Sequence, residues 1–157
     1  MKIMPTLEGG LRMDIEDPSD WHLLIGITHD AVSCDKPLAD RLGNLITEDE
    51  VADDWKEFVV PDLDEGFSTA LSDVATAIAS ARLESGGGPG PLWITREDGF
   101  SWYSALNQAR LALEEQYHFG PGEDVDPAKL PLDRRSPFLR SQFYCAIQSL
   151  LLDHVMG

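Results

Sequence analysis

Alternating apolar residues open the chain on both sides of a glycine pair, Gly9-Gly10. This period of two around a turn signal is typical of a β-hairpin. A three-residue loop, Glu8-Gly9-Gly10, would keep the apolar side chains on one face, because a slip of one residue turns every side chain over. We therefore predict a two-stranded hairpin within residues 1–16, with Gly10 in the left-handed conformation. The predicted register pairs Ile3 with Ile15, Pro5 with Met13 and Leu7 with Leu11.

Four helix starts follow, each marked by residues that cap a helix N-terminus. Two join a capping side chain to a proline at the first helical position, and two pair a threonine with an acid three residues later. The first helix should run to about Ser33, and a short helical turn is expected from Leu38 to Leu42. The four starts are Asp17-Pro18, Thr47 with Glu50, Thr95 with Asp98, and Ser136-Pro137.

The most regular helical stripe begins after Pro61, which we expect to end the shorter helix before it. Apolar residues recur there at helical spacing, which predicts a long helix from Leu63 onward. Segments 85–91 and 120–131 are rich in glycine and proline and are interpreted as loops. The predicted apolar positions are Val51, Trp55, Phe58 and Val59; Leu63, Phe67, Ala70, Leu71, Val74, Ala77, Ile78 and Ala81; Trp102, Ala105, Leu106, Ala109 and Leu113; and Phe138, Leu139, Phe143, Ala146, Ile147, Leu150 and Leu151.

These patterns predict a mainly α fold: a bundle of about five helices over residues 17–157, with the N-terminal two-stranded β-hairpin of residues 1–16 packed on it. At 157 residues the chain has the size of one domain, and neither half carries a core of its own, so we expect a single domain over 1–157. The last helix has a wide apolar arc. It should pack on two sides, either at the centre of the bundle or at a homodimer interface.

The charge of the chain limits its partners. There are 28 acidic and 12 basic residues, a formal net charge of −16. Such a field repels nucleic-acid phosphates and anionic lipids, so we expect neither nucleic acid nor membrane as a partner. Basic proteins, cationic ligands or metal ions suit this charge better, and among them a basic protein is the partner we consider further; high charge can also serve solubility alone.

Location and redox chemistry follow from simple features. Cys34 and Cys145 are far apart and have no metal-ligand spacing. The N-terminal residues do not have the pattern of a signal peptide, and no apolar run approaches the roughly 20 residues that span a bilayer. We expect a cytoplasmic protein.

No known catalytic or cofactor motif is present. The glycines at 86–90 follow a helix, the reverse of the order in a phosphate-binding loop. His22 and His29 stand two helical turns apart, about 10 Å, which is too far for one metal ion without other ligands. The stretch from Glu48 to Glu65 holds nine carboxylates and one lysine, but lacks the ligand spacing of a calcium loop. We therefore predict no catalytic residues, no metal and no cofactor.

One flank of a predicted helix carries polar residues of mixed type. Tyr103, Asn107, Arg110 and Glu114 follow each other at helical spacing, and Arg110 and Glu114 can form an i, i+4 ion pair. Asparagine in mid-helix has poor propensity, so it either ties the helix to another element or contacts a ligand. A ligand site here would use Tyr103, Asn107 and Arg110, with His22 from the first helix.

Four of the twelve basic residues lie within residues 129–140: Lys129, Arg134, Arg135 and Arg140. They could bind an anionic ligand, or they could lie against the acidic stretch of residues 48–65 in the same molecule. We favour the second arrangement, since it needs no partner.

The helix from Trp102 to Leu113 and the Ile147-Gln148-Ser-Leu-Leu-Leu152 segment carry a resemblance. They are similar to a family of uncharacterised bacterial proteins, a domain of unknown function of actinobacterial type. There the helix reads Trp-Leu-x-Ala-Leu-Asn-Asp-x-Arg-Leu-x-Leu. The resemblance covers about half of the chain and implies no established activity. It also implies that members are often encoded beside the adaptor of the Clp protease.

Two hypotheses follow. The first is a non-enzymatic, acidic interaction or regulatory module that binds a basic protein partner and forms a homodimer through the last helix. The second is a small-molecule-binding protein or enzyme built on the Tyr103, Asn107 and Arg110 flank.

Overall fold

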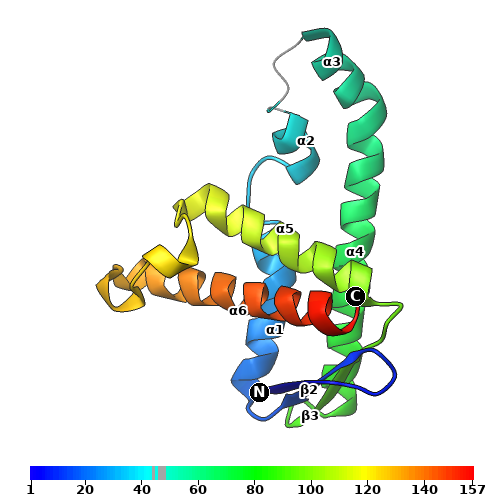
Figure 1. The fold of residues 1–157 in the computed structure, drawn as a ribbon, viewed down its shortest axis with the longest axis vertical. Coiled ribbons are helices and arrows are strands. Elements are labelled where there is room, and N and C mark those ends of the chain that lie inside the picture. The colour runs from blue at the N-terminus through cyan, green and yellow to red at the C-terminus, as the bar shows by residue number, and fades with distance from the viewer. Residues whose placement is uncertain (44, 46–48) are drawn as a thin grey trace.

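The computed structural model describes residues 1–43, 45 and 49–157. The predicted cap at Thr47 therefore lies outside the described residues. The fold is mainly helical with one small antiparallel sheet, in which three strands replace the predicted two (Figure 1). The strands are β1 (Lys2–Pro5), β2 (Leu11–Ile15) and β3 (Gly90–Ile94). The helices are α1 (Pro18–Ala31), α2 (Leu38–Gly43), α3 (Asp49–Asp54), the π-helical turn η1 (Trp55–Val59), α4 (Val60–Glu84), α5 (Gly99–Tyr117), the 3-10 turns η2 (Gly122–Asp124) and η3 (Pro127–Lys129), and α6 (Leu132–His154).

The N-terminal hairpin forms, but its register differs from the prediction by two residues. Pro5 pairs with Leu11 and Ile3 with Met13, so the loop covers residues 6–10. Thr6 closes this loop: its N–H donates to the Gly10 carbonyl at 2.9 Å, and its Oγ1 accepts from the Gly10 N–H at 2.9 Å. A shift of two keeps the same side chains on the buried face.

The third strand, β3, was not predicted, and its pairing with β2 explains why the hairpin register differs from the prediction. β2 lies between β1 and β3, and Leu11 pairs with Ile94. A Cβ on Gly10 would stand 2.2 Å from the Ile94 carbonyl oxygen, so glycine is required by this close approach. The left-handed residue is Gly9, with φ of 87°, and not Gly10 as predicted.

The predicted start of α1 is confirmed. Asp17 caps the helix by accepting from the Ser19 N–H at 2.9 Å, and Asp20 closes the capping box. Burial by itself would raise the pKa of Asp20. Hydrogen bonds from the backbone N–H groups of Glu16 and Asp17 outweigh this effect, so the pKa of Asp20 lies below its usual value. The Trp21 indole donates to the Gly88 carbonyl at 3.0 Å, which ties α1 to the turn before β3.

The prediction that Pro61 ends a helix is wrong. α3, η1 and α4 run on from Asp49 to Glu84 without a break, and the π turn ends two residues before the proline. A π turn widens the helix by one residue, and Pro61 near the start of α4 removes only one N–H donor. The apolar pattern before Pro61 was also misread, since Phe58 is 64% exposed.

The predicted start at Ser136-Pro137 is also wrong, because α6 begins at Leu132 and Pro137 lies inside it. The first turn is held by arginine side chains bonded to preceding carbonyls. Arg135 donates to the Leu130 carbonyl at 2.9 Å and to the Ala128 carbonyl at 3.0 Å. These bonds fix the extra turn ahead of the proline.

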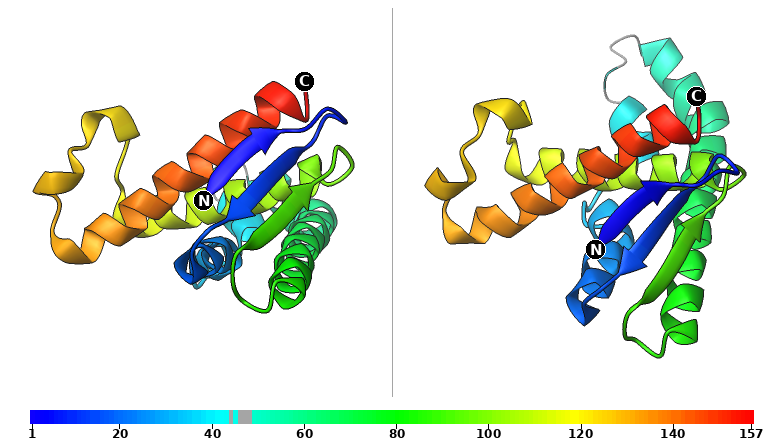
Figure 2. Two further views of the ribbon diagram at one scale, coloured as in Figure 1. Left: turned by 90° about the horizontal axis from the view of Figure 1, so that it is seen from below. Right: turned by 60° about the horizontal axis from the view of Figure 1, so that its bottom comes forward.

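The core lies where the sheet meets four helices. Figure 2 shows β1 on the side of α6 and β3 on the side of α4, with β2 between them. Every inward side chain of β2 is buried. In the part of the chain that the structure describes, no helix is both long and apolar enough to cross a membrane. The largest fully buried side chains include Trp21, Trp102, Tyr144, Leu11, Met13, Leu24, Leu106 and Ile147.

Candidate functional site

A polar cavity of about 290 Å³ lies between α5, α6 and the turn after α5. Two of the predicted ligand residues, Asn107 and Arg110, line it. Among the described residues, the Asn107 side chain has no hydrogen-bond partner, so it is not the structural tie that one interpretation expected. The other lining residues are Leu111, Glu114, Phe119, Gly120, Pro121, Gly122, Phe138, Ser141 and Gln142.

Arg110 is held at the inner wall of this cavity. Its Nη1 donates to Gln148 Oε1 at 2.5 Å, and Gln148 Nε2 donates in turn to the Tyr103 carbonyl at 3.4 Å. Gln148 is buried and fixes one edge of the guanidinium. Arg110 Nε is buried and has no hydrogen-bond partner within the described ranges.

The expected ion pair between Arg110 and Glu114 is absent from the described part of the chain. Glu114 Oε1 instead accepts from the Gly120 N–H at 3.0 Å. This bond draws the turn of residues 118–122 back over the end of α5. Arg110 is thus left without an anionic partner among the residues described.

An arginine and three aromatic rings fix the outer wall. Arg134 donates to the Tyr117 carbonyl, and its guanidinium lies 5.4 Å from the Phe119 ring centroid and 5.8 Å from that of Tyr117. Tyr117 and Phe119 stack at 5.4 Å, and Phe138 meets Phe119 edge-on at 5.3 Å. Two aromatic rings, Phe119 and Phe138, therefore line one wall of the cavity and are held there by contacts within the chain.

The other two predicted ligand residues lie elsewhere. Tyr103 contributes its carbonyl to the bond with Gln148 but does not line the cavity. His22 is exposed on α1, which supplies no lining residue. No group of three or more metal-ligating side chains is found among the described residues.

A buried polar cluster was missed by sequence reasoning. Asp30 of α1 accepts two bonds from Arg140, at 2.8 and 3.1 Å, and one from the Tyr144 hydroxyl at 2.6 Å. Burial and the bond to Asp30 raise the pKa of Tyr144 far above its usual range, so it stays protonated. The bond to Asp30 likewise raises the pKa of Arg140. Gly26 was the available signal, because a Cβ there would stand 3.1 Å from the Tyr144 oxygen.

The expectation that the basic residues 129–140 lie against the acidic stretch is wrong. Arg134 and Arg135 bond to backbone carbonyls near α6, and Arg140 pairs with Asp30. Figure 1 shows the start of α6 and the top of the α3–α4 helix at separate ends of the molecule. Backbone carbonyls and one buried carboxylate thus bind the three arginines of this segment.

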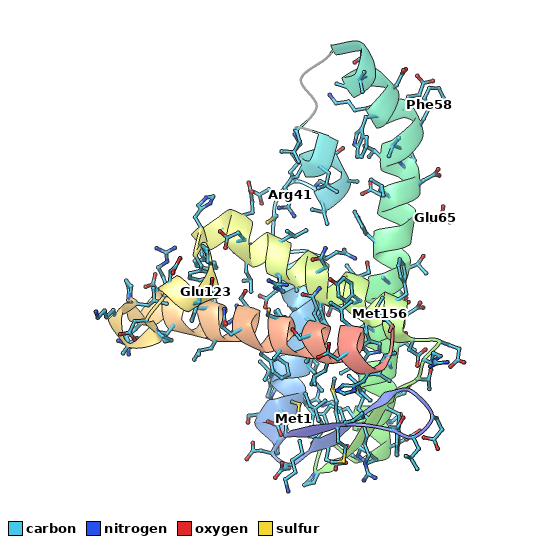
Figure 3. The ribbon with its side chains drawn as sticks, viewed as in Figure 1. Met1, Arg41, Phe58, Glu65, Glu123 and Met156 are labelled. Atoms are coloured by element: carbon cyan, nitrogen blue, oxygen red, sulfur yellow. The ribbon has the colours of Figure 1, made fainter. Side chains whose placement is uncertain are left out.

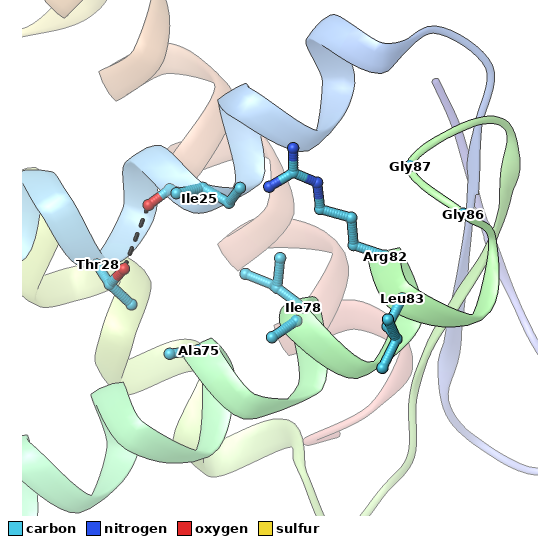
Figure 4. A pocket seen from close by; sticks show the side chains of 9 residues that line it. Ile25, Thr28, Ala75, Ile78, Arg82, Leu83, Gly86 and Gly87 are labelled. Carbon is cyan, nitrogen blue, oxygen red and sulfur yellow. Dashed lines mark hydrogen bonds between the residues drawn. The ribbon is translucent and has the colours of Figure 1, made fainter.

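An apolar groove of about 650 Å³ runs between α1 and α4 (Figure 4). Ile25 and Thr28 form one wall, and Ile78 and the half-exposed alanines of α4 form the other. Figure 4 shows Arg82 reaching from α4 toward α1 across the open end. The groove can accept apolar side chains, but nothing in its walls selects one occupant.

Fold and cavity together define a small helical domain with a three-stranded sheet and one framed polar pocket. The chain belongs to the family described as Domain of unknown function (DUF2017), whose model matches residues 7–155. Comparison with curated proteins and with solved structures found no match.

Proposed function

We propose that this protein is a non-enzymatic interaction module that binds a basic partner protein through its acidic arm, residues 51–65. The observation that carries the proposal is that the acidic side chains of the arm are not paired with basic side chains of the same chain among the described residues. Among the described residues, no ion pair involves the acids of the arm, and the three arginines of residues 129–140 are engaged elsewhere. Five of these acids are exposed on the helix surface: Asp53, Asp54, Glu57, Asp62 and Glu65.

Apolar side chains stand among these charges. Phe58 is 64% exposed and Val51 is 45% exposed. Figure 3 shows Phe58 and Glu65 on the side of the long helix that faces away from α2. An exposed aromatic ring within a charged surface is typical of a binding hot spot, because charge speeds encounter and the ring supplies affinity.

The setting of the proposal comes from the resemblance. A bacterial, cytoplasmic protein encoded beside the adaptor of the Clp protease would work among proteins that capture other proteins. This setting supports a regulatory role through binding and predicts no reaction of its own.

The test places a photo-crosslinking amino acid at position 58 of the full chain. Matched crosslinkers stand at Leu83, in the apolar groove, and at Leu152 of α6; these residues are 82% and 50% exposed. We expect capture of a basic protein at position 58 only, at about 50 mM salt, and its loss at about 500 mM. Capture of a basic protein at position 83 or 152 instead would contradict the proposal.

A charge variant provides the second measurement. Neutralising four of the five exposed arm acids should abolish capture at position 58. The control variant removes the same number of charges at exposed sites outside the arm and should leave capture unchanged. An equal loss of capture in both variants would show that the net charge of the chain, and not the arm, is responsible. The arm variant is D53N/D54N/E57Q/E65Q, and the control is E8Q/E97Q/E115Q/D153N.

A homodimer through α6 is a separate proposal. It is supported by Leu139, which is 56% exposed on the helix. Sedimentation velocity tests it directly: a dimer that dissociates in Leu139→Ser supports it, and a monomer at all concentrations refutes it.

A further inference from the structure

We infer that the cavity between α5, α6 and residues 119–122 binds a small carboxylate with an apolar body, with Arg110 as its anion-binding residue. This site is distinct from the acidic arm and does not depend on the protein-binding function proposed above. The inference rests on the charge, the unpaired polar groups and the shape of the cavity.

Arg110 is the first argument. The chain carries a net charge of −16, yet this half-buried guanidinium has no carboxylate within ion-pair distance among the described residues. Gln148 occupies only Nη1, and Nη2 has no acceptor among the described residues. The Nε is buried away from solvent, as are those of Arg41 and Arg134, so Nη2 is the group that can donate to a carboxylate in the cavity.

The surrounding groups narrow the class of ligand. Asn107 and Gln142 bring amides, and Ser141 brings a hydroxyl, so an anion would find neutral donors beside the guanidinium. Within the described part of the chain, Arg110 is the one cation that lines the cavity, and the Glu114 carboxylate lines it as well. A singly charged, planar carboxylate matches this balance, whereas a phosphate dianion would need a second cation.

The remaining wall is apolar and fixed. Phe119 and Phe138 meet edge-on, and Arg134 holds Phe119 from the far side. A volume of about 290 Å³ is at the small end for ligand sites, which suits a compact organic acid. Glu114 and Gly120 hold the turn in place, so little ordering is needed on binding.

The experiment uses the full chain and three probe acids: phenylacetate, benzoate and 4-methylpentanoate. Binding is followed by amide chemical shifts, with Gly120 and Gly122 as reporters of the site. We expect saturable shifts at these two amides for at least one acid, and binding at least about tenfold weaker for the matching neutral amide, such as phenylacetamide. Equal binding of acid and amide, or no saturable shift with any of the acids, would overturn the inference.

Variants then test the assigned residue. Arg110→Gln should weaken acid binding by at least about tenfold, and Asn107→Ala, which breaks no hydrogen bond of the described structure, should weaken it by a smaller factor. Arg82→Gln removes the same charge from the separate groove and should have no effect. If Arg110→Gln does not fold, the comparison of acid with amide on the unaltered chain decides the question. Tighter binding of inorganic phosphate than of any carboxylate would refute the ligand class.

Discussion

Gly26 of α1 provides the sharpest test of the buried cluster around Asp30. Alanine in place of a mid-helix glycine normally stabilises a helix by about 1 kcal/mol. Here the new Cβ would stand 3.1 Å from the Tyr144 hydroxyl oxygen, which must then move by a few tenths of an ångström. That oxygen is the donor atom in the 2.6 Å bond to Asp30, and a hydrogen bond to a charged group contributes about 1.5–3 kcal/mol. We therefore expect Gly26→Ala to destabilise the protein by about 1 kcal/mol. This is the difference between about 2 kcal/mol lost from the Tyr144–Asp30 hydrogen bond and about 1 kcal/mol gained from the higher helix propensity of alanine.

A double-mutant cycle separates the two contributions. Tyr144→Phe alone should cost about 2 kcal/mol, since it leaves Asp30 with one donor fewer. In that background the added methyl group meets no hydroxyl, so Gly26→Ala should instead stabilise by about 1 kcal/mol. Its effect thus changes sign, with a coupling energy of about 2 kcal/mol.

The measurement is urea unfolding followed by the fluorescence of the buried Trp21 and Trp102. Gly66→Ala is the matched control, because a Cβ on that α4 glycine would meet nothing within 4 Å. It should stabilise by about 1 kcal/mol. If Gly26→Ala stabilises the unaltered protein as much as Gly66→Ala does, or acts equally in both backgrounds, the reasoning about the cluster is refuted.

Three further predictions concern the sheet, the first cap and the buried ion pair. Gly10→Ala should lower the free energy of unfolding by at least about 2 kcal/mol in urea, because the Ile94 carbonyl, 2.2 Å from the new Cβ, belongs to a paired strand; unchanged stability would contradict the close approach. The backbone bond from Ser19 lowers the pKa of Asp17, so this cap adds stability above the unfolded-state pKa of about 3.9 and loses it as the pH falls through the lower native value. Asp17→Asn keeps a capping side chain, and its unfolding free energy should therefore fall less between about pH 6 and pH 3; identical pH profiles would exclude a titrating cap. Arg140→Met should cost about 3 kcal/mol in urea, since it leaves the Asp30 carboxylate buried without its cation, and Asp30→Asn in the same chain should recover part of the loss.

Local chemistry made part of the fold predictable. The Asp17 cap and the long stripe of α4 both depend on neighbours within a few residues. The predicted start at Thr95 is displaced: α5 begins three residues later, at Gly99, because the Asp98 side chain accepts from the Thr95 N–H and hydroxyl in a turn ahead of the helix. Strand β3 depends on a partner some eighty residues away, and its short run of alternating residues carries no turn signal that points to β2. Because that pairing also sets the hairpin register, missing it displaced the register as well.

The candidate site likewise has one part that the sequence predicts and one part that it does not. Asn107 was recognisable as an unusual helix residue, and the structure places it with Arg110 at a cavity. The turn that closes the cavity could not be foreseen, because Glu114 bonds to a backbone N–H and not to Arg110. In the same way, the arginines of α6 bond to carbonyl groups, which every residue carries and no sequence pattern marks.

The π turn at Trp55–Val59 decides which way the acidic arm faces. In a regular α-helix each residue turns the chain by about 100°, so Trp55 would point about 80° away from Leu63 and about 120° away from Phe67. By absorbing one residue, the π turn brings Trp55 into phase with that face to within about 20°, and its indole reaches the Ala39 carbonyl of α2 at 3.2 Å. The one extra residue in the π turn therefore sets the direction of the acidic residues before it relative to the apolar stripe of α4. A chain lacking that phase shift would keep every acidic side chain and present them in another direction.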